Sequence, residues 1–436
     1  MTDLIKMSPS EFVAFLKKNG IRKFCFVYDA KDGKIVASHD KLEPIAKFMN
    51  EDTRDFDEHE GVFFQLSREY DTLLGAFVHR TCRGQAAGGV RYWSYNTVED
   101  FMRDGMRLGK GMTLKNALAG LWWGGGKGVM VVNPSFDKSD PKIRQSIYKE
   151  YGEFLTSIKG CYVTAEDVGT SEEDMLNVFR NTRFTTCIPQ NVGGSGNPSA
   201  PTARGVVSGM EAALAFANMG TIAEKTIVIQ GMGHVAQPLV GYLFERGAKK
   251  VIGSDIDKES LRLASEKFKN FNFEPRLTTY GDNAILKEDC DIVAPCATGA
   301  VLNPQTIPLI KAKIICGAAN NQLEDHDRDD EAIFARNIIY VPDFLTNRMG
   351  IVNCADESYG YVNNDPAFER HLERDWKNGI FKVTLEVLDL SKKENVSPSR
   401  VAIRLADKLS RQNHPITGHR GALIIKSLIE NGWSSQ

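Results

Sequence analysis

The chain has 436 residues, enough for about two or three domains of ordinary size. It is 42% hydrophobic and 25% charged, and its 54 basic and 56 acidic residues leave a net charge of −2. Nucleic-acid binders usually carry a basic excess, so this balance argues against a nucleic-acid partner and against a basic membrane anchor. Because it shows no apolar run of transmembrane length and no signal-peptide pattern, the sequence predicts a cytoplasmic protein without a membrane partner.

The eight cysteines and eight histidines are dispersed, and they form no Cys-x-x-Cys or His-Glu-x-x-His pattern. Those spacings are typical of thiol redox motifs and of zinc sites. We therefore expect reduced thiols that pack as small apolar side chains, and no metal site.

The N-terminal segment, residues 1–55, contains two local patterns. SPSEFVAFLKKNG has the periodicity of an amphipathic helix, and two β-rich runs flank Asp32-Gly33, which is a turn signal. We predict a helix followed by a β-hairpin, in a segment that extends the protein at its N-terminus.

Residues 56–200 mix strand-like runs with the long helical pattern VEDFMRDGMRLGKGMTLKNALAGL. From residue 201 to 356, short apolar runs such as TIVIQG alternate with segments of helix length. That alternation predicts a parallel sheet with helices on both faces, and hence an α/β fold. Amphipathic helices follow in residues 357–411, and residues 412–436 form a polar extension with one more helix.

A glycine-rich turn follows the strand-like run TIVIQ. It has the pattern Gly-x-Gly-x-x-Ala, formed by Gly231, Met232, Gly233, His234, Val235 and Ala236. Between a strand and a helix, such glycines permit a tight turn and the close approach of a pyrophosphate, which the helix N-terminus stabilises. Asp255 ends the next strand, where a carboxylate accepts hydrogen bonds from ribose hydroxyls and repels a 2′-phosphate. The pattern therefore predicts NAD as the cofactor.

A second glycine cluster, Gly124-Gly125-Gly126, directly precedes Lys127. It is not a P-loop, because Leu121 occupies the first glycine position and Gly128 replaces the Ser or Thr that holds Mg²⁺. We interpret the glycines as clearing side chains from around Lys127, so that a small substrate and water can approach a lysine whose pKa is lowered by desolvation.

Two further polar residues belong to this candidate site: Lys115 in GMTLKNA and Asp167 in TAEDVGT. Two lysines and a carboxylate suit an amino-acid substrate, with one cation for its carboxylate, one poised lysine and one proton acceptor for its amine. The alternative interpretation is that these are ordinary solvated surface residues.

Together these stretches resemble the glutamate/leucine/phenylalanine/valine dehydrogenase family, most closely its leucine and phenylalanine dehydrogenase branch. The match runs collinearly over roughly residues 56–411, through GGVRYWSYN, GKGMTLKNALAGL, GGGKG, TAEDVGTS, GGSGNPSAPTARGV, QGMGHVA, ATGAVLN, GAANNQL, VPDFLTN and GIVNCADE. The resemblance implies two domains around a cleft: an amino-acid-binding and catalytic domain (residues 56–200 and 357–411) and a Rossmann domain (residues 201–356). It also implies a homo-oligomer, a dimer or larger.

The resemblance further implies the roles of individual residues. Lys127 would be the catalytic lysine that activates water, Asp167 would move protons to and from the substrate nitrogen, and Lys115 would bind the substrate carboxylate. The residues near the nicotinamide would be Thr202, Asn320 and Asn321. The other residues around the substrate would be Ala87, Gly88, Gly89, Met112, Ala165, Ile351 and Cys354.

The implied reaction is the NAD-dependent oxidative deamination of an L-amino acid to a 2-oxo acid and ammonia. Relatives that use glutamate hold its side-chain carboxylate with a Lys and a Ser, and those two positions are Ala87 and Cys354 here. Burying a carboxylate without a partner is costly, so we expect an apolar substrate, branched-chain or aromatic. A glutamate dehydrogenase and a non-catalytic homologue that binds an amino acid or nucleotide are the alternatives.

Several residues depart from the family's pattern. Trp122 and Trp123 stand where relatives carry smaller residues, Arg348 and Met349 replace an Ala-Gly pair, and Asn197 replaces an Asp. The bulky residues either reshape the pocket or point into a core.

Overall fold

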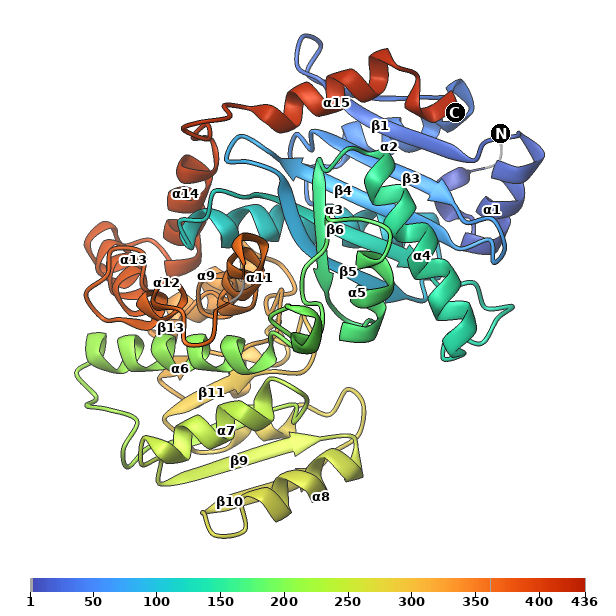
Figure 1. Ribbon diagram of the computed structural model, residues 1–436. Helices are drawn as coiled ribbons and strands as arrows, with labels where there is room; N and C mark the ends of the chain where they lie inside the picture. Colours follow the sequence, from blue (N-terminus) through green and yellow to red (C-terminus); the bar gives the residue numbers. More distant parts are fainter. Residues whose placement is uncertain (1–2, 361, 436) are drawn as a thin grey trace. The chain divides into compact units, whose positions relative to one another are not determined.

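The computed structural model describes residues 3–360 and 362–435, and its chain divides into two compact units (Figure 1). Unit 1 comprises Met1–Asn197, Cys354–Tyr361 and Ala406–Gln436, and unit 2 comprises Pro198–Asn353 and Val362–Leu405. Among the described residues, no helix combines the length and apolar character that a membrane crossing needs.

Unit 1 is built on a mixed sheet of seven strands in the order β2-β1-β3-β4-β6-β5-β7. The strands are β1 (Lys23–Asp29), β2 (Lys34–Ala37), β3 (Gly61–Leu66), β4 (Leu73–Arg80), β5 (Ala86–Trp93), β6 (Gly124–Val131) and β7 (Tyr162–Glu166). The pairs from β2 to β6 are antiparallel, whereas β5 is parallel to both β6 and β7. The carboxyl-terminal ends of β5 and β7 therefore lie side by side at the same end of the strands.

Helices flank this sheet. They are α1 (Pro9–Lys18), α2 (Glu43–Glu51), α3 (Val98–Leu118), α4 (Pro141–Ser157), α5 (Glu172–Phe179) and α15 (Arg420–Glu430), with the short 3-10 helices η1 (Leu4–Lys6), η2 (Asp40–Leu42), η3 (Gln190–Val192) and η7 (Trp433–Ser435). The long α3 packs against β4 and β6. It begins at a capping box, in which Thr97 and Asp100 satisfy each other's backbone N–H groups.

The predicted N-terminal helix and hairpin are confirmed. Ser8 caps α1 through a capping box with Glu11, and β1 pairs with β2 from Asp29↔Lys34 onward. The segment is also more than an extension, because β1 pairs with β3 and its side chains enter the core of unit 1. The Phe24 ring, for example, stacks on that of Phe64 at 5.0 Å between centroids.

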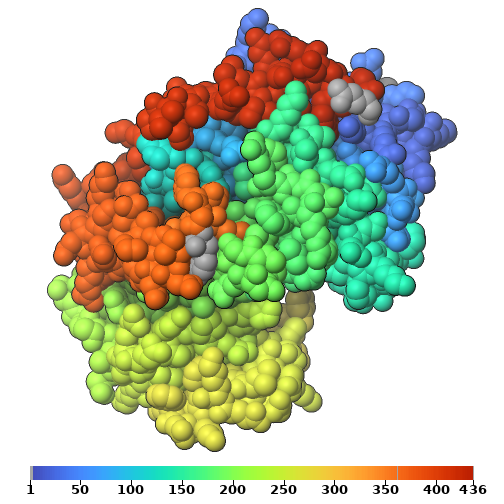
Figure 2. Space-filling model, viewed as in Figure 1, coloured from blue at the N-terminus to red at the C-terminus, as the bar shows by residue number. Residues whose placement is uncertain are grey.

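The C-terminal segment completes the same unit. The predicted helix is present as α15, and after it Trp433 is buried against Phe63, with 5.4 Å between ring centroids. The Trp433 indole N–H donates to the hydroxyl of Ser157 at 3.0 Å. In the space-filling view this segment, coloured red, covers part of unit 1 (Figure 2).

Unit 2 contains a sheet of six parallel strands in the order β10-β9-β8-β11-β12-β13. They are β8 (Thr226–Gln230), β9 (Lys250–Asp255), β10 (Phe273–Leu277), β11 (Ile292–Pro295), β12 (Ile314–Ile315) and β13 (Ile339–Tyr340). Numbered within the unit, this is the Rossmann order 3-2-1-4-5-6, which reverses between β8 and β11. The predicted α/β fold with a parallel sheet is confirmed.

The helices of unit 2 include one segment that was predicted to belong to the amino-acid-binding domain. They are α6 (Ser199–Phe216), α7 (Ala236–Glu245), α8 (Lys258–Lys267), α9 (Arg328–Ala335), α10 (Asp343–Thr346), α12 (Pro366–Glu369) and α13 (Ile380–Glu394), with η4 (Ala284–Lys287), η5 (Ile307–Leu309) and η6 (Arg370–Leu372). Two more helices, α11 (Met349–Tyr359) and α14 (Pro398–Ser410), cross the division between the units.

Residues 362–405 belong to unit 2 and not, as predicted, to the amino-acid-binding domain. The reason is the packing of α13 against α6. Leu388 of α13 lies in the same apolar core as Val206 and Met210 of α6, which places this helix with the Rossmann sheet.

Candidate active site

An ion pair links strand β6 to the loop that follows β7 in unit 1. Lys127 projects from β6 and is 3% exposed, and Asp167 directly follows β7. The Lys127 Nζ lies 2.9 Å from Asp167 Oδ2. The structure thus brings together the two residues that the sequence analysis assigned to catalysis.

Arg91 is a third member of this group, and sequence reasoning missed it. Its Nε donates to Asp167 Oδ2 at 3.3 Å, and its Nη1 lies 3.0 Å from both carboxylate oxygens of Asp104. The hydroxyl of Tyr95 also donates to Asp104 at 2.6 Å. The sequence did contain a signal for Arg91. It follows Gly89 by two residues on β5, and residues two apart on a strand share one face of the sheet.

The surroundings shift the pKa values of the pair. Burial lowers the pKa of the Lys127 ammonium below the ordinary lysine value, with Asp167 opposing the shift. Burial alone would raise the pKa of Asp167, but the charges of Lys127 and Arg91 hold it well below the ordinary value. The site therefore holds an ionised carboxylate beside a lysine that gives up its proton more readily than a solvated one, as general acid–base catalysis requires.

The glycines before Lys127 serve a different purpose from the predicted one. A Cβ atom at Gly125 would lie 2.1 Å from the Thr113 backbone nitrogen, and one at Gly124 would lie 2.0 Å from the Arg80 carbonyl oxygen. Neighbouring backbone therefore fills the space beside these glycines. They let α3 and β4 approach closely to β6, the strand that carries Lys127.

The predicted substrate residues Gly88 and Gly89 are points of close packing on β5. A Cβ atom at Gly89 would lie 2.7 Å from the Cβ of Asp167, and Ala165 of β7 is the strand partner of Gly89. A Cβ atom at Gly88 would lie 2.8 Å from Cγ of Met112 on α3. Close approach at these two glycines therefore brings β5 against both the Asp167 loop and α3.

Lys115 lies near the end of α3 and is 9% exposed. The side-chain amide of the next residue, Asn116, donates to the carbonyl of Gly124 at 2.5 Å and to that of Ala87 at 3.4 Å. These bonds tie the end of α3, which carries Lys115, to β5 and to β6, the strand that carries Lys127.

Cys354 is buried in unit 1, with its Sγ 3.2 Å from that of Cys187. Ile351 lies one turn earlier on α11 and falls in unit 2. Glu357, one turn after Cys354, accepts the backbone N–H groups of Cys187 at 2.8 Å and of Ser195 at 2.9 Å. This anchoring carboxylate was not recognised in the sequence, although it belongs to the GIVNCADE stretch.

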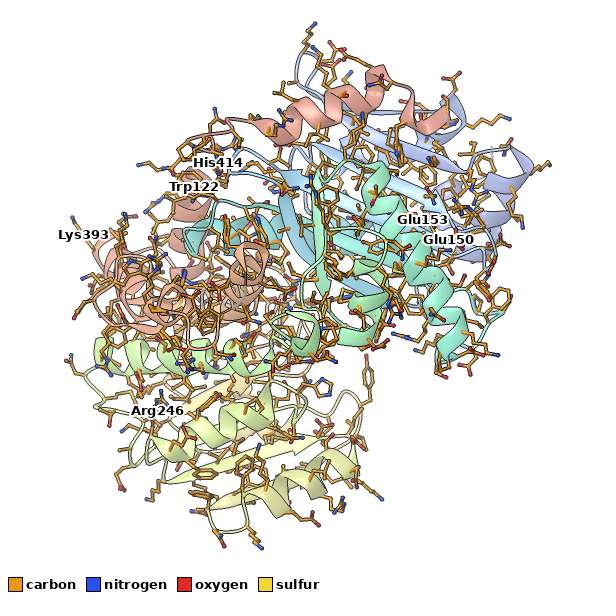
Figure 3. All side chains as sticks on the ribbon, viewed as in Figure 1. Trp122, Glu150, Glu153, Arg246, Lys393 and His414 are labelled. Carbon is orange, nitrogen blue, oxygen red and sulfur yellow. The ribbon has the colours of Figure 1, made fainter. Side chains whose placement is uncertain are left out.

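The two tryptophans differ in their surroundings. Trp123 is buried, whereas Trp122 is 38% exposed, with the Arg83 guanidinium 4.2 Å from its ring centroid and the His414 ring at 5.5 Å (Figure 3). Their described contacts do not include Lys127 or Asp167.

Arg348 and Met349 both point into unit 2. Arg348 is fully buried and donates to the carbonyl of Asn378, and burial lowers its pKa to about 9. A Cβ atom at Gly205 of α6 would lie 2.8 Å from Cγ of Met349. Of the two interpretations of the bulky residues, a position in a core therefore holds for Arg348 and Met349.

The glycine turn of unit 2 follows β8, where the strand order reverses. Gly231 has φ +92°, and a Cβ atom there would lie 2.7 Å from that of Ala297. A Cβ atom at Gly233 would meet no atom within 4 Å, so this backbone is open to a ligand. The turn suits a dinucleotide, since a pyrophosphate needs close backbone approach at this position.

The rest of the turn divides into core and surface. Met232 and Ala236 are buried, His234 is exposed, and Val235 is half-buried just before α7 begins. Asp255 lies beside them, because its Oδ2 accepts the Met232 backbone N–H at 2.6 Å. The carboxylate that the sequence assigned to the ribose is therefore in contact with the glycine turn.

Unit 2 also holds the three residues assigned to the nicotinamide. Thr202 lies in the first turn of α6. Asn321 has φ +53° and donates its backbone N–H to Asp343 Oδ2 at 3.0 Å, while Asn320 Oδ1 accepts the side-chain amide of Asn347 at 2.9 Å. Both asparagines are thus held in a loop after β12.

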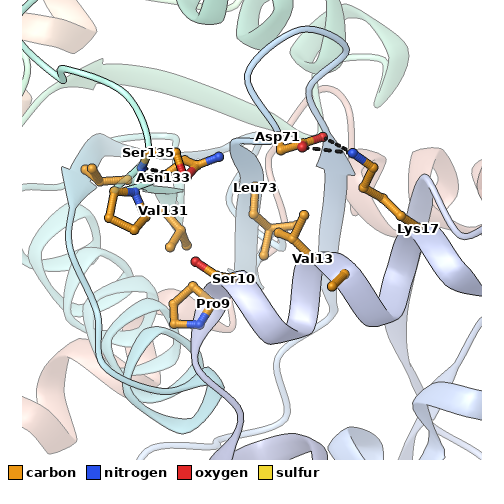
Figure 4. Close-up of a pocket in the computed structure, with 12 residues that line it drawn as sticks. Pro9, Ser10, Val13, Lys17, Asp71, Leu73, Val131, Asn133 and Ser135 are labelled. Atoms are coloured by element: carbon orange, nitrogen blue, oxygen red, sulfur yellow. Dashed lines mark hydrogen bonds and ion pairs between the residues drawn. The ribbon is translucent and has the colours of Figure 1, made fainter.

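A separate cavity of about 430 Å³ lies beside α1 and the end of β6 (Figure 4). The Lys17–Asp71 ion pair, with 2.9 Å between nitrogen and oxygen, forms part of its wall. None of the predicted site residues lines this cavity, so it is not a candidate for the active site.

Comparison with known proteins gives consistent matches. Residues 70–184 match the family described as "Glu/Leu/Phe/Val dehydrogenase, dimerisation domain", and residues 193–408 match "Glutamate/Leucine/Phenylalanine/Valine dehydrogenase". The chain is 40% identical over 370 residues to leucine dehydrogenase from Bacillus cereus, covering 83% of this chain and 95% of that protein. It is 34% identical over 370 residues to phenylalanine dehydrogenase from Bacillus thermotolerans, and the match covers 83% of this chain and 92% of that protein.

Solved structures give the same picture of the fold. L-tryptophan dehydrogenase from Nostoc punctiforme is 29% identical with a TM-score of 0.64, covering 81% of this chain and 97% of that one. Glutamate dehydrogenase from Peptoniphilus asaccharolyticus shares the fold at 18% identity and a TM-score of 0.59, and the match covers 98% of this chain and 100% of that one.

Proposed function

The chain belongs to the glutamate/leucine/phenylalanine/valine dehydrogenase family, and from this premise we propose that it catalyses the NAD-dependent oxidative deamination of an apolar L-amino acid. The products are the 2-oxo acid, ammonia and NADH. The observation that carries the proposal is the buried Lys127–Asp167 pair at 2.9 Å, because a purely structural homologue would need neither charge in that position.

Side chains of unit 1 perform the proton transfers in this proposal. Lys115 pairs with the substrate carboxylate and orients Cα, and Asp167 takes a proton from the substrate ammonium. The Gly231 turn and Asp255 would hold NAD, which would supply the acceptor for the hydride from Cα. Neutral Lys127 then takes a proton from the water that attacks the iminium carbon. Asp167 returns its proton to the nitrogen, and the hydroxyl of the resulting carbinolamine releases its proton to solvent as the carbonyl forms and ammonia leaves.

The preference for NAD rests on Asp255. Its carboxylate lies against the glycine turn, where it can accept hydrogen bonds from ribose hydroxyls. A 2′-phosphate would bring a second anion to the same place. We therefore expect kcat/KM to be much higher with NAD than with NADP. Comparable values would contradict the proposed position of Asp255 at the ribose.

The preference for an apolar side chain rests on Ala87 and Cys354. Both are buried, and neither can neutralise or fully solvate a carboxylate. Leucine, valine, phenylalanine and tryptophan dehydrogenases among the similar proteins are consistent with this class of substrate. Because apolar pockets discriminate weakly, about 1–3 kcal/mol per methylene, we expect several such amino acids to react.

A homo-oligomer, a dimer or larger, is part of the proposal. The family segment matched by residues 70–184 is described as a dimerisation domain. Size-exclusion chromatography with light scattering measures the number of chains directly, and a monomer at working concentrations would contradict this part.

The function is tested by following NADH absorbance while the purified protein is offered the twenty amino acids in turn. We expect the highest rates with apolar amino acids and little or no reaction with glutamate. Faster reduction with glutamate would favour the glutamate dehydrogenase alternative. If no amino acid reacts but NAD still binds, the chain is a non-catalytic homologue.

A further inference from the structure

Three metal-ligand side chains meet in unit 1 where the C-terminal segment reaches the sheet. Glu60 directly precedes β3, Cys82 follows β4, and His419 directly precedes α15. One ligand atom from each lies within 4.8 Å of the other two, and no other group of three such donors does so among the described residues. None of the three contributes to the deamination proposed above.

The partners of His419 converge on one ring nitrogen. Its Nε2 lies 3.0 Å from Glu60 Oε1 and 3.8 Å from Cys82 Sγ, and the Thr81 hydroxyl oxygen is 3.1 Å away. In a Cys–His–acid relay, the thiol and the acid use different ring nitrogens. Here both face the same nitrogen, and a single N–H cannot point at both. A cation placed among the three donors can contact all of them.

The spacing also suits such a cation. Tetrahedral zinc with nitrogen, oxygen and sulfur ligands places its donor atoms about 3.3–3.6 Å apart. The separations of 3.0 and 3.8 Å lie on either side of that range, so small side-chain movements would complete the geometry. A neutral imidazole, a thiolate and a carboxylate also neutralise a divalent cation without help from another residue.

We propose that Glu60, Cys82 and His419 bind a divalent cation of the zinc class that fastens α15 to the sheet. The fourth position falls to water or to the Thr81 hydroxyl. Binding displaces the thiol proton of Cys82, and any proton on His419 Nε2, into solvent. We assign this cation a structural role, because none of its three ligands belongs to the Lys127–Asp167 pair.

The surroundings hold the ligands in place. The Thr81 N–H donates to Glu60 Oε1 at 2.8 Å, and the Thr81 hydroxyl donates to Glu60 Oε2, which fixes the carboxylate. A Cβ atom at Gly421 would lie 2.2 Å from Thr81 Oγ1, so the start of α15 approaches this residue as closely as a glycine allows. Fastening α15 at this point would keep Trp433 in its buried position.

The sequence could not predict this site. Cys82 and His419 are 337 positions apart, and no local motif relates them. His419 also lies beyond residue 408, where the family match ends. The site is therefore a feature of this chain and not one implied by the resemblance.

The test uses the full-length protein, equilibrated with Zn²⁺, dialysed and analysed for metal. We expect close to one zinc per chain, a higher thermal unfolding midpoint than after EDTA treatment, and an unchanged rate of NADH formation after EDTA. With Co²⁺ in place of Zn²⁺, we expect a thiolate-to-metal charge-transfer band. Wild-type protein without stoichiometric zinc, or cobalt-loaded protein without that band, would overturn the proposal.

Two variants identify the ligands. Cys82→Ser and His419→Gln should each weaken zinc binding at least tenfold, and the glutamine keeps a polar group beside Glu60. Cys290→Ser and His326→Gln, which lie outside the cluster, are matched controls and should bind zinc as the wild type does. Zinc bound equally well by both ligand variants would also overturn the proposal. Should either variant fail to fold, the wild-type cobalt spectrum still decides the question. Because the deamination rate is measured separately, loss of the proposed function and absence of the metal are distinguishable.

Discussion

At the scale of single residues, the charges around Lys127 are matched. Lys127 and Arg91 face Asp167 and Asp104, so two cations and two carboxylates meet where Lys127 is buried and the other three are half-buried. A buried charge is tolerated when it is paired and hydrogen-bonded, whereas removing one partner leaves the other uncompensated. Substitutions in this group therefore affect both stability and activity, and their tests must separate the two.

Lys127→Ala is expected to lower kcat by about 10²–10⁴-fold, the usual contribution of general acid–base catalysis. Binding of NAD should change little, because Gly231, Gly233 and Asp255 all belong to unit 2. Steady-state kinetics and NAD titration by fluorescence measure the two effects. Lys31→Ala, at an exposed lysine, is the control. A variant with near-normal turnover would remove Lys127 from the mechanism.

Lys115→Ala is expected to act differently from Lys127→Ala. If Lys115 binds the substrate carboxylate, its loss chiefly raises the apparent KM for the amino acid, by about tenfold or more, as the loss of a charged contact does. The apparent KM for NAD should stay the same. A variant with an unchanged amino-acid KM and a low kcat would contradict this assignment.

Glu166 gives a prediction about pH. Burial, together with nearby carboxylates, raises the pKa of Glu166 to about 7. The folded protein then keeps this proton at pH values where the unfolded chain has lost it, so stability falls as pH rises from about 4.3 to about 7. Glu166→Gln resembles the protonated form. Between pH 5 and pH 8, the free energy of unfolding of this variant should rise by about 1–2 kcal/mol relative to that of the wild type, after allowance for partial solvation.

Urea unfolding of the wild type and Glu166→Gln at both pH values measures this difference. Glu173→Gln, at an exposed position on α5, is the control and should follow the wild type. Parallel pH dependence in all three proteins would show that Glu166 is ionised throughout this range.

At the scale of elements, a helical pattern predicts that one face is buried but not which partner covers it. The pattern of residues 380–394 is amphipathic, and the resemblance placed it with the amino-acid-binding domain. In the structure α13 packs on α6 of unit 2. The small residues Gly205 and Gly209 on α6 permit close contact with neighbouring side chains there.

Leu388→Ala tests this assignment. Leu388 is 2% exposed in the core that contains the Rossmann strands, so its truncation should cost about 2–5 kcal/mol of unfolding free energy. The loss should appear in the unfolding transition that NAD shifts to higher temperature, because that transition reports on unit 2. Leu423→Ala, at a residue 60% exposed on α15, is the control. A loss confined to an NAD-independent transition would contradict the packing.

At the scale of the whole molecule, both ends of the chain complete unit 1. The N-terminal strand β1 extends the sheet, and the C-terminal η7 packs against β1. A stable unit 1 therefore requires residues from the beginning and from the end of the chain.

Trp433→Ala is expected to lower the unfolding free energy of unit 1 by about 3–5 kcal/mol, because it removes a buried ring and its hydrogen bond to Ser157. Ile429→Ala, at a residue 46% exposed on α15, is the matched control. Thermal unfolding followed by near-ultraviolet circular dichroism measures the effect. Equal stability of the two variants would show that the C-terminal segment contributes little to the core.

The local features of the fold follow from the sequence alone. The helix after Ser8, the hairpin at Gly33, the alternation that forms the parallel sheet and the Gly231 turn all follow from backbone preferences and periodicity within a few residues. The resemblance added the roles of Lys127, Asp167 and Lys115, which stay predictions until tested.

Features that depend on contacts between distant segments could be recognised only from the folded chain. Arg91 became part of the site because β5 lies beside the Asp167 loop, and the glycines before Lys127 proved to be points of close packing. Glu60, Cys82 and His419 meet only because α15 folds back onto the sheet. Residues far apart in sequence have no local preference for one another, so burial and packing of the whole chain decide which of them come into contact.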